Sequence, residues 1–417
     1  MNLVIIGLGY VGLPLASEAC MNQMTVRGVD ASPELVEALN AGKSHVDDLS
    51  DSDLVAMLDA GFEAVTGPSI ITEADVIVIC VPTPLSSDFT PDLSFVRAAA
   101  RAVAENLQAG CLVVLESTTY PGTTEDVVKP ILEEGSGLTA GIDFALAYSP
   151  ERTDPGNPNY GLRNTPKVVG GLTAECTNSA IEFYGKLVDT VVPTVGIREA
   201  ELSKLLENTY RHVNIALMNE MAVFCHELGI DLWAAIEAAK TKPFGYEAFY
   251  PGPGVGGHCI PIDPNYLPWV VRSVGYRFRF VELAQEISDR MPSYVAQRVQ
   301  DLLNNDKKPV NGSVVLLLGV TYKANVSDQR ETPARPLAAC LSAMGAEVRY
   351  FDPHAHTFTF DGRELVGEDD LEEALGNADL SILVQAHNEI IESGALKLAR
   401  RILDTRGVLS GDNVERL

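Results

Sequence analysis

The sequence predicts an α/β protein with two Rossmann-like, doubly wound domains that are joined by a central helical domain with one long helix. Three observations favour this class. Short apolar runs that end in polar loops alternate with helical stretches in the first part of the chain. A middle stretch, residues 199–228, contains neither proline nor glycine. The last part of the chain then repeats the strand and loop pattern of the first part in a weaker form.

The first domain opens with the pattern of a strand, a tight turn and a helix. "NLVIIG" has the composition of a buried strand, and "GLPLASEA" continues as a helix beyond a glycine-rich turn. Later apolar runs such as "ADVIVICVPTP" and "CLVVLESTTYPGTT" end in loops that contain proline or glycine. Ligands of parallel doubly wound sheets bind at the carboxyl ends of the strands, so we expect the site at these loops.

The middle of the chain predicts one long helix over residues 199–228 and a second helix that starts at Asp231, with Gly229 as the C-cap between them. At 1.5 Å per residue the first helix is about 45 Å long, which exceeds the width of a small domain. We therefore expect it to connect domains and to carry a dimer contact. The predicted boundaries are 1–195 for the first domain, 196–305 for the helical domain and 306–417 for the last domain.

The last domain echoes the first without its complete glycine motif. "SVVLLLGVT", "AEVRYFDP" and "ADLSILVQAHN" correspond to "NLVIIGLG", "TVRGVD" and "ADVIVICVPTP". The second and third glycines of the dinucleotide fingerprint are missing from this repeat. We therefore expect no second dinucleotide to bind there.

The charge of the chain limits its partners. Lys and Arg total 31 against 57 Asp and Glu, so the formal charge is −26. An excess of this size repels phosphate and disfavours nucleic acid and anionic membranes as partners. The apolar runs are too short for a transmembrane helix, and the chain starts as a strand without the pattern of a signal peptide. A cytoplasmic protein is expected.

The seven cysteines form no CxxC pair, so neither a disulfide framework nor a metal site is expected. Six of them lie in apolar strand-like or helix-like stretches and are interpreted as small core residues: Cys20, Cys80, Cys111, Cys176, Cys225 and Cys340. Cys259 differs, because it lies in the backbone-rich loop "PGPGVGGHCIPIDP". A thiolate in such a loop can attack an aldehyde carbon, and a nearby cation such as Lys204 would lower its pKa from about 8.5. The alternative is an incidental buried cysteine.

The glycine-rich turn predicts NAD. Gly7, Gly9 and Gly12, with Tyr10 and Val11 between them, form GxGxxG directly between a strand and a helix. Asp30 ends the next strand, where an acidic residue accepts hydrogen bonds from the ribose hydroxyls and repels the extra phosphate of NADP.

The long helix carries a second polar group of residues. Lys204, Asn208 and Arg211 stand at i, i+4 and i+7 and therefore share one face. The spacing alone leaves a functional face and a solvated face equally open.

Seven motifs occur in order along nearly the whole chain, and together they resemble the UDP-glucose/GDP-mannose dehydrogenase family. They are "GLGYVG", "VPTP", "ESTTYPGTT", "YSPER", "SKLLENTYRHVNIALMNE", "PGPGVGGHCIPIDP" and "GVTYKANVSDQRETP". The resemblance implies an N-terminal NAD domain, a central dimerisation domain and a C-terminal domain that binds the nucleotide sugar. It also implies oxidation of the C6 hydroxyl to a carboxylate with two NAD, through a cysteine thiohemiacetal and a thioester.

The resemblance assigns roles to particular residues. It makes Cys259 the nucleophile, places Lys204 and Asn208 beside the reacting oxygen, and gives Asp263 the task of positioning or activating the hydrolytic water. Further catalytic residues would be Thr118 and Glu151. The implied NAD-binding residues are Gly7, Gly9, Tyr10, Val11, Gly12, Asp30, Thr83, Thr118 and Arg330. The implied substrate-binding residues are Glu151, Arg152, Lys204, Asn208, Arg211, Tyr250, Gly252, Gly254, Gly256 and Lys323.

The motif around Cys259 resembles most the UDP-N-acetylglucosamine 6-dehydrogenase branch, which serves surface polysaccharide biosynthesis. The glucose branch differs, because Pro155 replaces its second glutamate and Ile262 replaces its lysine. UDP-GlcNAc is therefore the expected substrate, with UDP-glucose, UDP-GalNAc and UDP-ManNAc as alternatives. A two-electron hydroxy-acid dehydrogenase would leave Cys259 without a role, and a non-catalytic NAD-binding protein would make it unreactive.

Overall fold

The computed structural model spans residues 1–417 and describes all of them except 87–89, 155, 158, 258, 259 and 261. Cys259 and Pro155 thus lie outside the described residues. The chain divides into two compact units. The first unit contains Met1–Glu207 and Trp269–Val274, and the second contains Asn208–Pro268 and Gly275–Leu417.

The first unit is built on one largely parallel sheet with the order β3-β2-β1-β4-β5-β6-β7-β8. Strand β1 (Asn2–Ile6) pairs in parallel with β2 (Thr25–Val29) on one side and β4 (Val76–Ile79) on the other. The pairing of β6 with β7 is antiparallel. The remaining strands are β3 (Glu63–Val65), β5 (Leu112–Leu115), β6 (Ala145–Tyr148), β7 (Lys167–Gly171) and β8 (Val191–Pro193). All four residues of β4 and of β5 are buried, as expected for strands covered on both faces.

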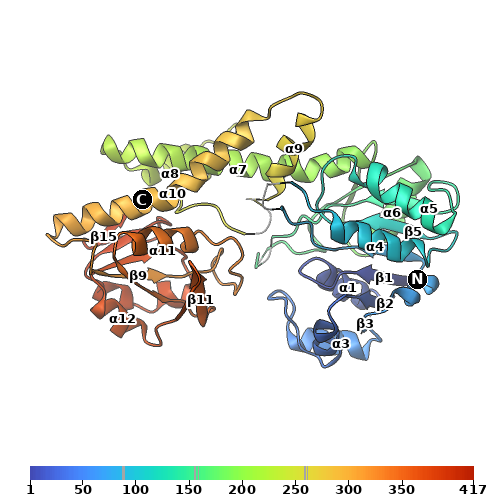
Figure 1. Cartoon of the computed structure of the whole chain (residues 1–417), viewed down its shortest axis with the longest axis horizontal. Coiled ribbons are helices and arrows are strands. Elements are labelled where there is room, and N and C mark those ends of the chain that lie inside the picture. Colours follow the sequence, from blue (N-terminus) through green and yellow to red (C-terminus); the bar gives the residue numbers. More distant parts are fainter. Residues whose placement is uncertain (87–89, 155, 158, 258–259, 261) are drawn as a thin grey trace. The chain divides into compact units, whose positions relative to one another are not determined.

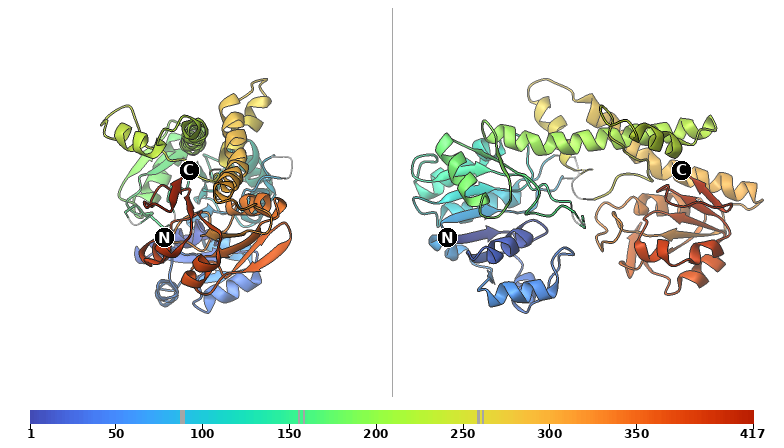
Figure 2. Two further views of the ribbon diagram at one scale, coloured as in Figure 1. Left: turned by 90° about the vertical axis from the view of Figure 1, so that its left-hand side faces the viewer. Right: turned by 180° about the vertical axis from the view of Figure 1, so that it is seen from behind.

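Helices cover both faces of this sheet, as Figures 1 and 2 show. One apolar core contains side chains of α1, α3 and α6, and a second core on the other face contains those of α4 and α5. The prediction of a doubly wound first domain is therefore confirmed. The helices are α1 (Gly12–Met21), α2 (Pro33–Asn40), α3 (Asp51–Asp59), α4 (Ser94–Ala104), α5 (Lys129–Ser136) and α6 (Ala174–Tyr184), with short turns η1 (Pro68–Glu73) and η2 (Thr124–Val128).

The predicted long helix is confirmed as α7, which runs over Ile197–Glu227 and contains 31 residues. Its end follows from local chemistry. Gly229 has φ +67°, a left-handed conformation that favours glycine, and Ile230 N–H donates to the carbonyl of Cys225 at 2.9 Å. Helix α8 (Leu232–Lys240) then starts where predicted, because the Asp231 side chain accepts a hydrogen bond from Ala234 N–H at 3.1 Å.

The second unit contains a parallel sheet with the order β10-β9-β13-β14-β15. Apolar cores lie on both faces of it, so the second Rossmann-like half is also confirmed. Its strands are β9 (Val314–Leu318), β10 (Glu347–Phe351), β13 (Leu380–Leu383), β14 (Ile402–Asp404) and β15 (Val414–Arg416), beside the hairpin of β11 (Thr357–Phe360) and β12 (Arg363–Val366). Further helices are α9 (Tyr266–Arg272), α10 (Arg279–Asn305), α11 (Ala334–Ala343), α12 (Leu371–Asn377) and α13 (Asn388–Glu392), with short turns η3 (Asp263–Asn265) and η4 (Ala395–Leu398).

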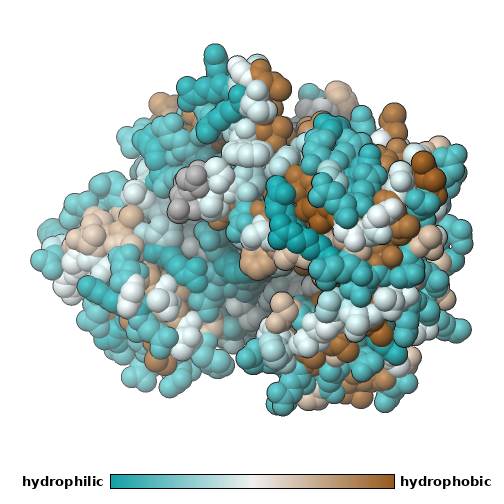
Figure 3. All heavy atoms as spheres, turned by 45° about the vertical axis from the view of Figure 1, so that its right-hand side comes forward, coloured by the Kyte–Doolittle hydropathy of each residue, from teal (hydrophilic) through white to brown (hydrophobic). Residues whose placement is uncertain are grey.

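The surface is ordinary for a globular protein. Hydrophobic residues form small separate patches among hydrophilic ones on the face drawn in Figure 3. Among the helices that the structure describes, none combines the length and the apolar character that crossing a membrane requires. Cys340 corrects one expectation, because it is only partly buried on α11, whereas the other five cysteines outside the glycine-rich loop are buried.

Candidate active site

The glycine turn after β1 is shaped by close packing at two positions and open at the third. Gly7 has φ +92°, and a Cβ atom there would lie 2.6 Å from the carbonyl oxygen of Cys80. A Cβ atom at Gly12 would lie 2.0 Å from the carbonyl oxygen of Gly7. A Cβ atom at Gly9 would meet nothing within 4 Å, so packing does not require this glycine. Its missing side chain leaves the backbone before α1 open to a phosphate group.

Asp30 lies beside this turn. One carboxylate oxygen accepts a hydrogen bond from Leu8 N–H at 3.0 Å, and the other accepts one from Ser32 N–H at 3.0 Å. Each oxygen keeps a further lone pair that can accept from a ribose hydroxyl. The open glycine turn and this carboxylate together fit NAD.

The loops after β4 and β5 are tied to each other at the same edge of the sheet. Thr83 Oγ1 donates to the carbonyl oxygen of Thr118 at 2.7 Å, and Ser117 Oγ donates to that of Val81 at 2.7 Å. Because Gly7 packs against Cys80, this pair of loops adjoins the glycine turn. Thr83 and Thr118, two of the predicted cofactor residues, therefore lie at the carboxyl ends of the strands beside the predicted NAD site.

Glu151 belongs to a buried cluster of charges. The Lys167 ammonium bonds the carboxylate of Glu116 and lies 3.4 Å from Oε2 of Glu151. Oε1 of Glu151 accepts hydrogen bonds from the backbone N–H groups of Arg152 at 2.8 Å and Thr153 at 2.5 Å. The Lys167 and Glu116 side chains are only 3% and 0% exposed, so water cannot substitute for either partner.

This cluster keeps Glu151 ionised. Burial alone would raise the pKa of Glu151, but the charge of Lys167, the hydrogen bonds from Thr153 and the charge of Lys204 outweigh it and lower the pKa to about 2. Burial raises the pKa of Glu116 despite the opposing charge of Lys167. The structure therefore brings Glu151 and Lys204, two predicted catalytic residues, into one electrostatic environment.

The sequence analysis missed both Glu116 and Lys167. A signal was present, because each is a charged residue next to an apolar run: Glu116 follows the run in "CLVVLE", and Lys167 precedes it in "PKVVGG". Two other predicted substrate residues have different surroundings. The Arg152 guanidinium binds Glu207 at 2.7 Å and the carbonyl oxygen of Pro166 at 2.6 Å, and Arg211 is exposed on α7. Their roles in substrate binding remain predictions.

Glu201 anchors the loop that follows Thr118. It is fully buried on α7 and accepts hydrogen bonds from Gly122 N–H at 2.5 Å, Thr124 N–H at 2.9 Å and Thr124 Oγ1 at 2.7 Å. Burial raises the pKa of Glu201 to about 7, although these hydrogen bonds act in the opposite direction. The sequence analysis did not find this residue, because nothing local indicates that α7 meets the 122–124 loop.

This raised pKa makes stability depend on pH in a defined direction. A carboxyl whose pKa is about 7 in the folded protein, against its usual 4.5, stabilises the fold when protonated. That contribution is lost as the pH rises from 4.5 through 7, and its full size is about 3 kcal/mol. We expect the melting temperature of the wild type to fall relative to that of Glu201→Gln between pH 5 and pH 8. Scanning calorimetry across this range measures the difference, and a constant difference would contradict the assignment.

In the second unit, the structure joins two predicted catalytic residues. The Asn208 side-chain amide donates to a carboxylate oxygen of Asp263 at 2.6 Å. Asp263 is 4% exposed and begins η3, four positions after Cys259 in the chain. The hydrogen bond therefore holds the start of this turn against α7.

The glycine-rich loop packs against the segment that carries Lys323. A Cβ atom at Gly256 would lie 2.8 Å from the carbonyl oxygen of Glu331, and one at Gly257 would lie 2.8 Å from the ring of Tyr322. Gly254 and Gly252 continue this path, since a Cβ atom at Gly254 would approach Pro333 to 3.1 Å and Gly252 N–H donates to Asn219 at 2.9 Å. The loop thus needs glycine for close approach.

A hollow with a volume of about 510 Å³ adjoins this loop in the second unit. Its walls include Trp233, Tyr250 and Arg406, and the rings of Trp233 and Tyr250 stack at 5.7 Å. A guanidinium nitrogen of Arg406 lies 3.4 Å from the Cβ position of Gly252. Burial lowers the pKa of Arg406 to about 10, against the opposing effect of Asp404, so it is charged at neutral pH. A buried cation on its wall makes this hollow suitable for an anionic group.

Arg406 was missed by the sequence analysis, although it stands in the polar loop "DTRG" that follows an apolar strand. Arg330 lies in the second unit, where its guanidinium binds Asp328 with contacts of 2.6 to 3.0 Å. Its predicted reach toward NAD remains a prediction.

Comparison with known families identifies the family to which the chain belongs. Residues 1–188 match the NAD binding domain of the UDP-glucose/GDP-mannose dehydrogenase family, residues 198–290 its central domain, and residues 316–411 its UDP binding domain. The chain belongs to the UDP-glucose/GDP-mannose dehydrogenase family. It is an NAD-dependent nucleotide-sugar dehydrogenase. Binding of NAD at the glycine turn and Asp30 stays a prediction.

Individual members of the UDP-glucose/GDP-mannose dehydrogenase family are similar over nearly their whole length. A Pyrococcus horikoshii protein named UDP-N-acetyl-D-mannosamine dehydrogenase is 34% identical over 391 residues, which cover 93% of this chain and 90% of that one. A Ralstonia nicotianae protein named NDP-N-acetyl-D-galactosaminuronic acid dehydrogenase is 34% identical over 424 residues, covering 98% and 96%. The solved structure of UDP-D-ManNAc dehydrogenase from Pyrococcus horikoshii has a TM-score of 0.90 and 32% identity, covering 100% of this chain and 99% of that one.

Proposed function

We propose that the protein oxidises the C6 hydroxyl of a UDP-N-acetylhexosamine to the carboxylate in two steps, with Cys259 as the covalent nucleophile. The hydrogen bond between Asn208 and Asp263 carries this proposal. It brings together the residue expected beside the reacting oxygen and the residue expected to position water, next to the loop of Cys259. A two-electron dehydrogenase has no need of a carboxylate or a thiol at this place.

Each residue then has a defined task. Bound NAD supplies the hydride acceptor in both oxidations. The Lys204 ammonium and the Asn208 amide stabilise negative charge on the C6 oxygen as its proton leaves. The Cys259 thiolate adds to the aldehyde carbon, and the resulting thiohemiacetal loses a second hydride and its hydroxyl proton to become a thioester. Asp263 orients the water that replaces the sulfur, and the thiol and the carboxylate are released.

The preferred sugar is UDP-ManNAc or UDP-GalNAc. The motif around Cys259 favours UDP-GlcNAc, but the similar proteins above carry the names of mannosamine and galactosaminuronic acid dehydrogenases. Identity over nearly the whole chain is better support than one loop, because it draws on all three domains. The acid product would serve surface polysaccharide biosynthesis.

We further propose a homodimer through α7. Tyr210, Leu217 and Phe224 stand at intervals of seven residues along this helix and are 50%, 47% and 46% exposed. Residues at this spacing share one helix face, and large apolar side chains on an exposed face favour a partner helix. A second copy of the chain supplies an identical face, as a symmetric dimer requires.

The yield of NADH from a limiting amount of sugar tests the function. UDP-ManNAc, UDP-GalNAc, UDP-GlcNAc and UDP-glucose are each incubated with excess NAD, and NADH is measured at completion. We expect two NADH per molecule of UDP-ManNAc or UDP-GalNAc, with slower turnover of the other two sugars. Two NADH from UDP-GlcNAc at the highest rate would keep the mechanism and overturn the proposed sugar. One NADH or none from all four would overturn the mechanism itself.

A further inference from the structure

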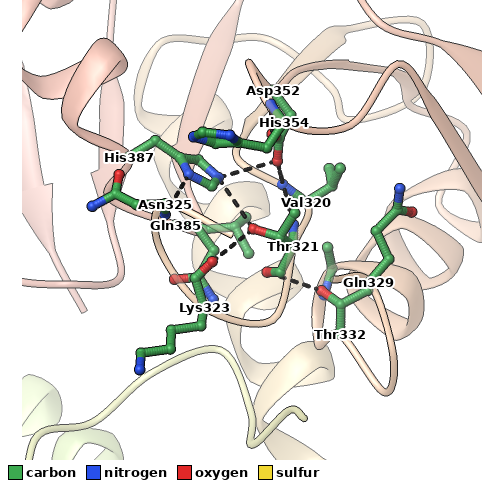
Figure 4. Close-up of polar contacts among 12 residues, drawn as sticks. Val320, Thr321, Lys323, Asn325, Gln329, Thr332, Asp352, His354, Gln385 and His387 are labelled. Carbon is green, nitrogen blue, oxygen red and sulfur yellow. Dashed lines mark hydrogen bonds and ion pairs between the residues drawn. The ribbon is translucent and has the colours of Figure 1, made fainter. Parts of the chain in front are cut away.

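The two Rossmann-like halves differ at the turn after the first strand of each sheet, which follows β1 in the first half and β9 in the second. In both halves an aspartate follows the second strand and accepts a hydrogen bond from the turn after the first strand. Asp30 accepts from Leu8 N–H, and Asp352 accepts from Val320 N–H at 2.6 Å. In the second half, however, a histidine from the loop after β13 also bonds this aspartate. Nε2 of His387 lies 3.2 Å from Oδ2 of Asp352 (Figure 4).

His387 fills the position where a dinucleotide would lie. It is 0% exposed, and its ring packs against that of His354 at 4.9 Å. Gln385, two residues earlier, packs against the turn after β9, because a Cβ atom at Gly319 would lie 2.6 Å from its Cβ. The side chain of His387 thus lies beside the turn that lacks the second and third glycines.

The polarity of the contacts determines the tautomer of His387. Asn325 N–H donates to Nδ1 at 2.9 Å, so Nδ1 carries no proton and the neutral ring holds its proton on Nε2. Nε2–H then points to acceptors, the carboxylate of Asp352 and, at 3.2 Å, the hydroxyl oxygen of Thr321. That hydroxyl donates its own proton to the carbonyl oxygen of Lys323 at 2.8 Å. The proton on Nε2 is thus shared between Asp352 and Thr321, and the Thr321 hydroxyl proton goes to Lys323 (Figure 4).

These contacts fix the backbone on both sides of Lys323. Thr321 is held two residues before it and Asn325 two residues after it, and Asn325 has φ +62°, an unfavourable conformation for a residue with a side chain. Gln385 adds a bond to the carbonyl oxygen of Tyr322 at 2.6 Å. The same segment supports the glycine-rich loop through the ring of Tyr322. Its shape therefore affects both parts of the sugar site.

We propose that His387, oriented by Asp352, is a positioning residue for nucleotide-sugar binding, which it serves by holding the 321–325 segment that carries Lys323. This inference rests on the proposed function, in which Lys323 contacts the nucleotide sugar. His387 touches no substrate and acts only through the segment that it holds.

Two substitutions of His387 test the roles of its two ring nitrogens separately. His387→Asn keeps an acceptor at the position of Nδ1, whereas His387→Gln keeps a donor at the position of Nε2 and removes the acceptor of Asn325 N–H. Loss of this hydrogen bond releases one end of the 321–325 segment. His387→Gln should raise the KM for the sugar nucleotide and the Kd for UDP about tenfold or more, with the KM for NAD unchanged. His387→Asn should stay within about threefold of the wild type.

Ser381→Ala is the matched control, because Ser381 is a buried polar residue of β13 whose hydroxyl has no partner among the described residues. It should leave both KM values unchanged. Equal sugar KM values in the wild type and His387→Gln would overturn the proposal, as would equal losses of sugar and NAD binding. If His387→Gln does not fold, Thr321→Val removes the hydroxyl that bonds Lys323, and an unchanged sugar KM in that variant would also overturn it. Absence of UDP binding by the wild type would instead refute the proposed function.

Discussion

Cys259→Ser produces no sugar acid, while its affinity for NAD stays at the wild-type value. The proposed route needs a sulfur nucleophile to trap the aldehyde and then to leave from the thioester. A serine hydroxyl has a much higher pKa than a thiol, so it is a poorer nucleophile at neutral pH and a poorer leaving group. Loss of a covalent nucleophile lowers turnover by on the order of 10³-fold or more. Residual activity should therefore stop before the acid is formed.

The measurement is the amount of uronic acid, determined by mass spectrometry, together with NADH yield and NAD affinity. Cys340→Ser is the matched control, because Cys340 is a partly buried thiol that has no role in the proposed mechanism. It should behave as the wild type. Full acid production by Cys259→Ser would refute the thioester, and loss of NAD affinity would show that the substitution acts on the fold.

Lys167→Met destabilises the first unit by about 3–5 kcal/mol, the usual cost of removing one partner from a buried ion pair. The fully buried carboxylate of Glu116 loses its cation, and Glu151, whose side chain is 15% exposed, loses one of its favourable contacts. The wild-type pKa of Glu151 is about 2, so its contribution to stability is present above its usual value of 4.5 and is lost as the pH falls through 2. Without Lys167, the largest effect that opposes burial is gone, so the pKa of Glu151 rises and its contribution is lost at a higher pH than in the wild type.

Lys167→Met should therefore also shift the acidic limb of the pH–rate profile upward, if the enzyme needs ionised Glu151. Lys167→Arg retains the charge and should restore the profile even where the larger side chain reduces stability. Lys186→Met is the surface control, because Lys186 pairs with Glu182 in an exposed i,i+4 contact worth less than about 1 kcal/mol. Equal melting temperatures of Lys167→Met and Lys186→Met would show that the buried cluster contributes nothing to stability.

Several parts of the fold could be predicted because they depend on residues close together in the chain. Gly7 and Gly12 are needed for the sterics of one turn, and their spacing shows this directly. Helix α7 extends over the stretch that lacks glycine and proline and ends next to Gly229. The family resemblance gave Asn208 and Asp263 separate catalytic roles, and only the structure shows the hydrogen bond between them.

The residues that were missed depend on contacts between distant segments. Glu116 and Lys167 are separated by 51 positions, and Glu201 and Thr124 by 77. Each of these residues alone has the pattern of an ordinary polar side chain at the end of a strand or on a helix. The fold brings these residues together in buried positions. A buried charged group costs free energy unless it has a partner, so the residues pair there.

The sequence by itself determined the order of strands and helices, the NAD turn, the long helix and the family, because hydrophobic period, glycine sterics and motif order are local properties of the chain. The tertiary structure alone decided which charges are buried together and which of the two aspartates, Asp30 or Asp352, is covered by a further side chain. Glu151 is ionised because Lys167 lies beside it, and Asp352 is covered because His387 reaches it. Such pairings arise from packing across the sheet, where the free energy of an ionic or hydrogen-bonding group depends on its neighbours in space.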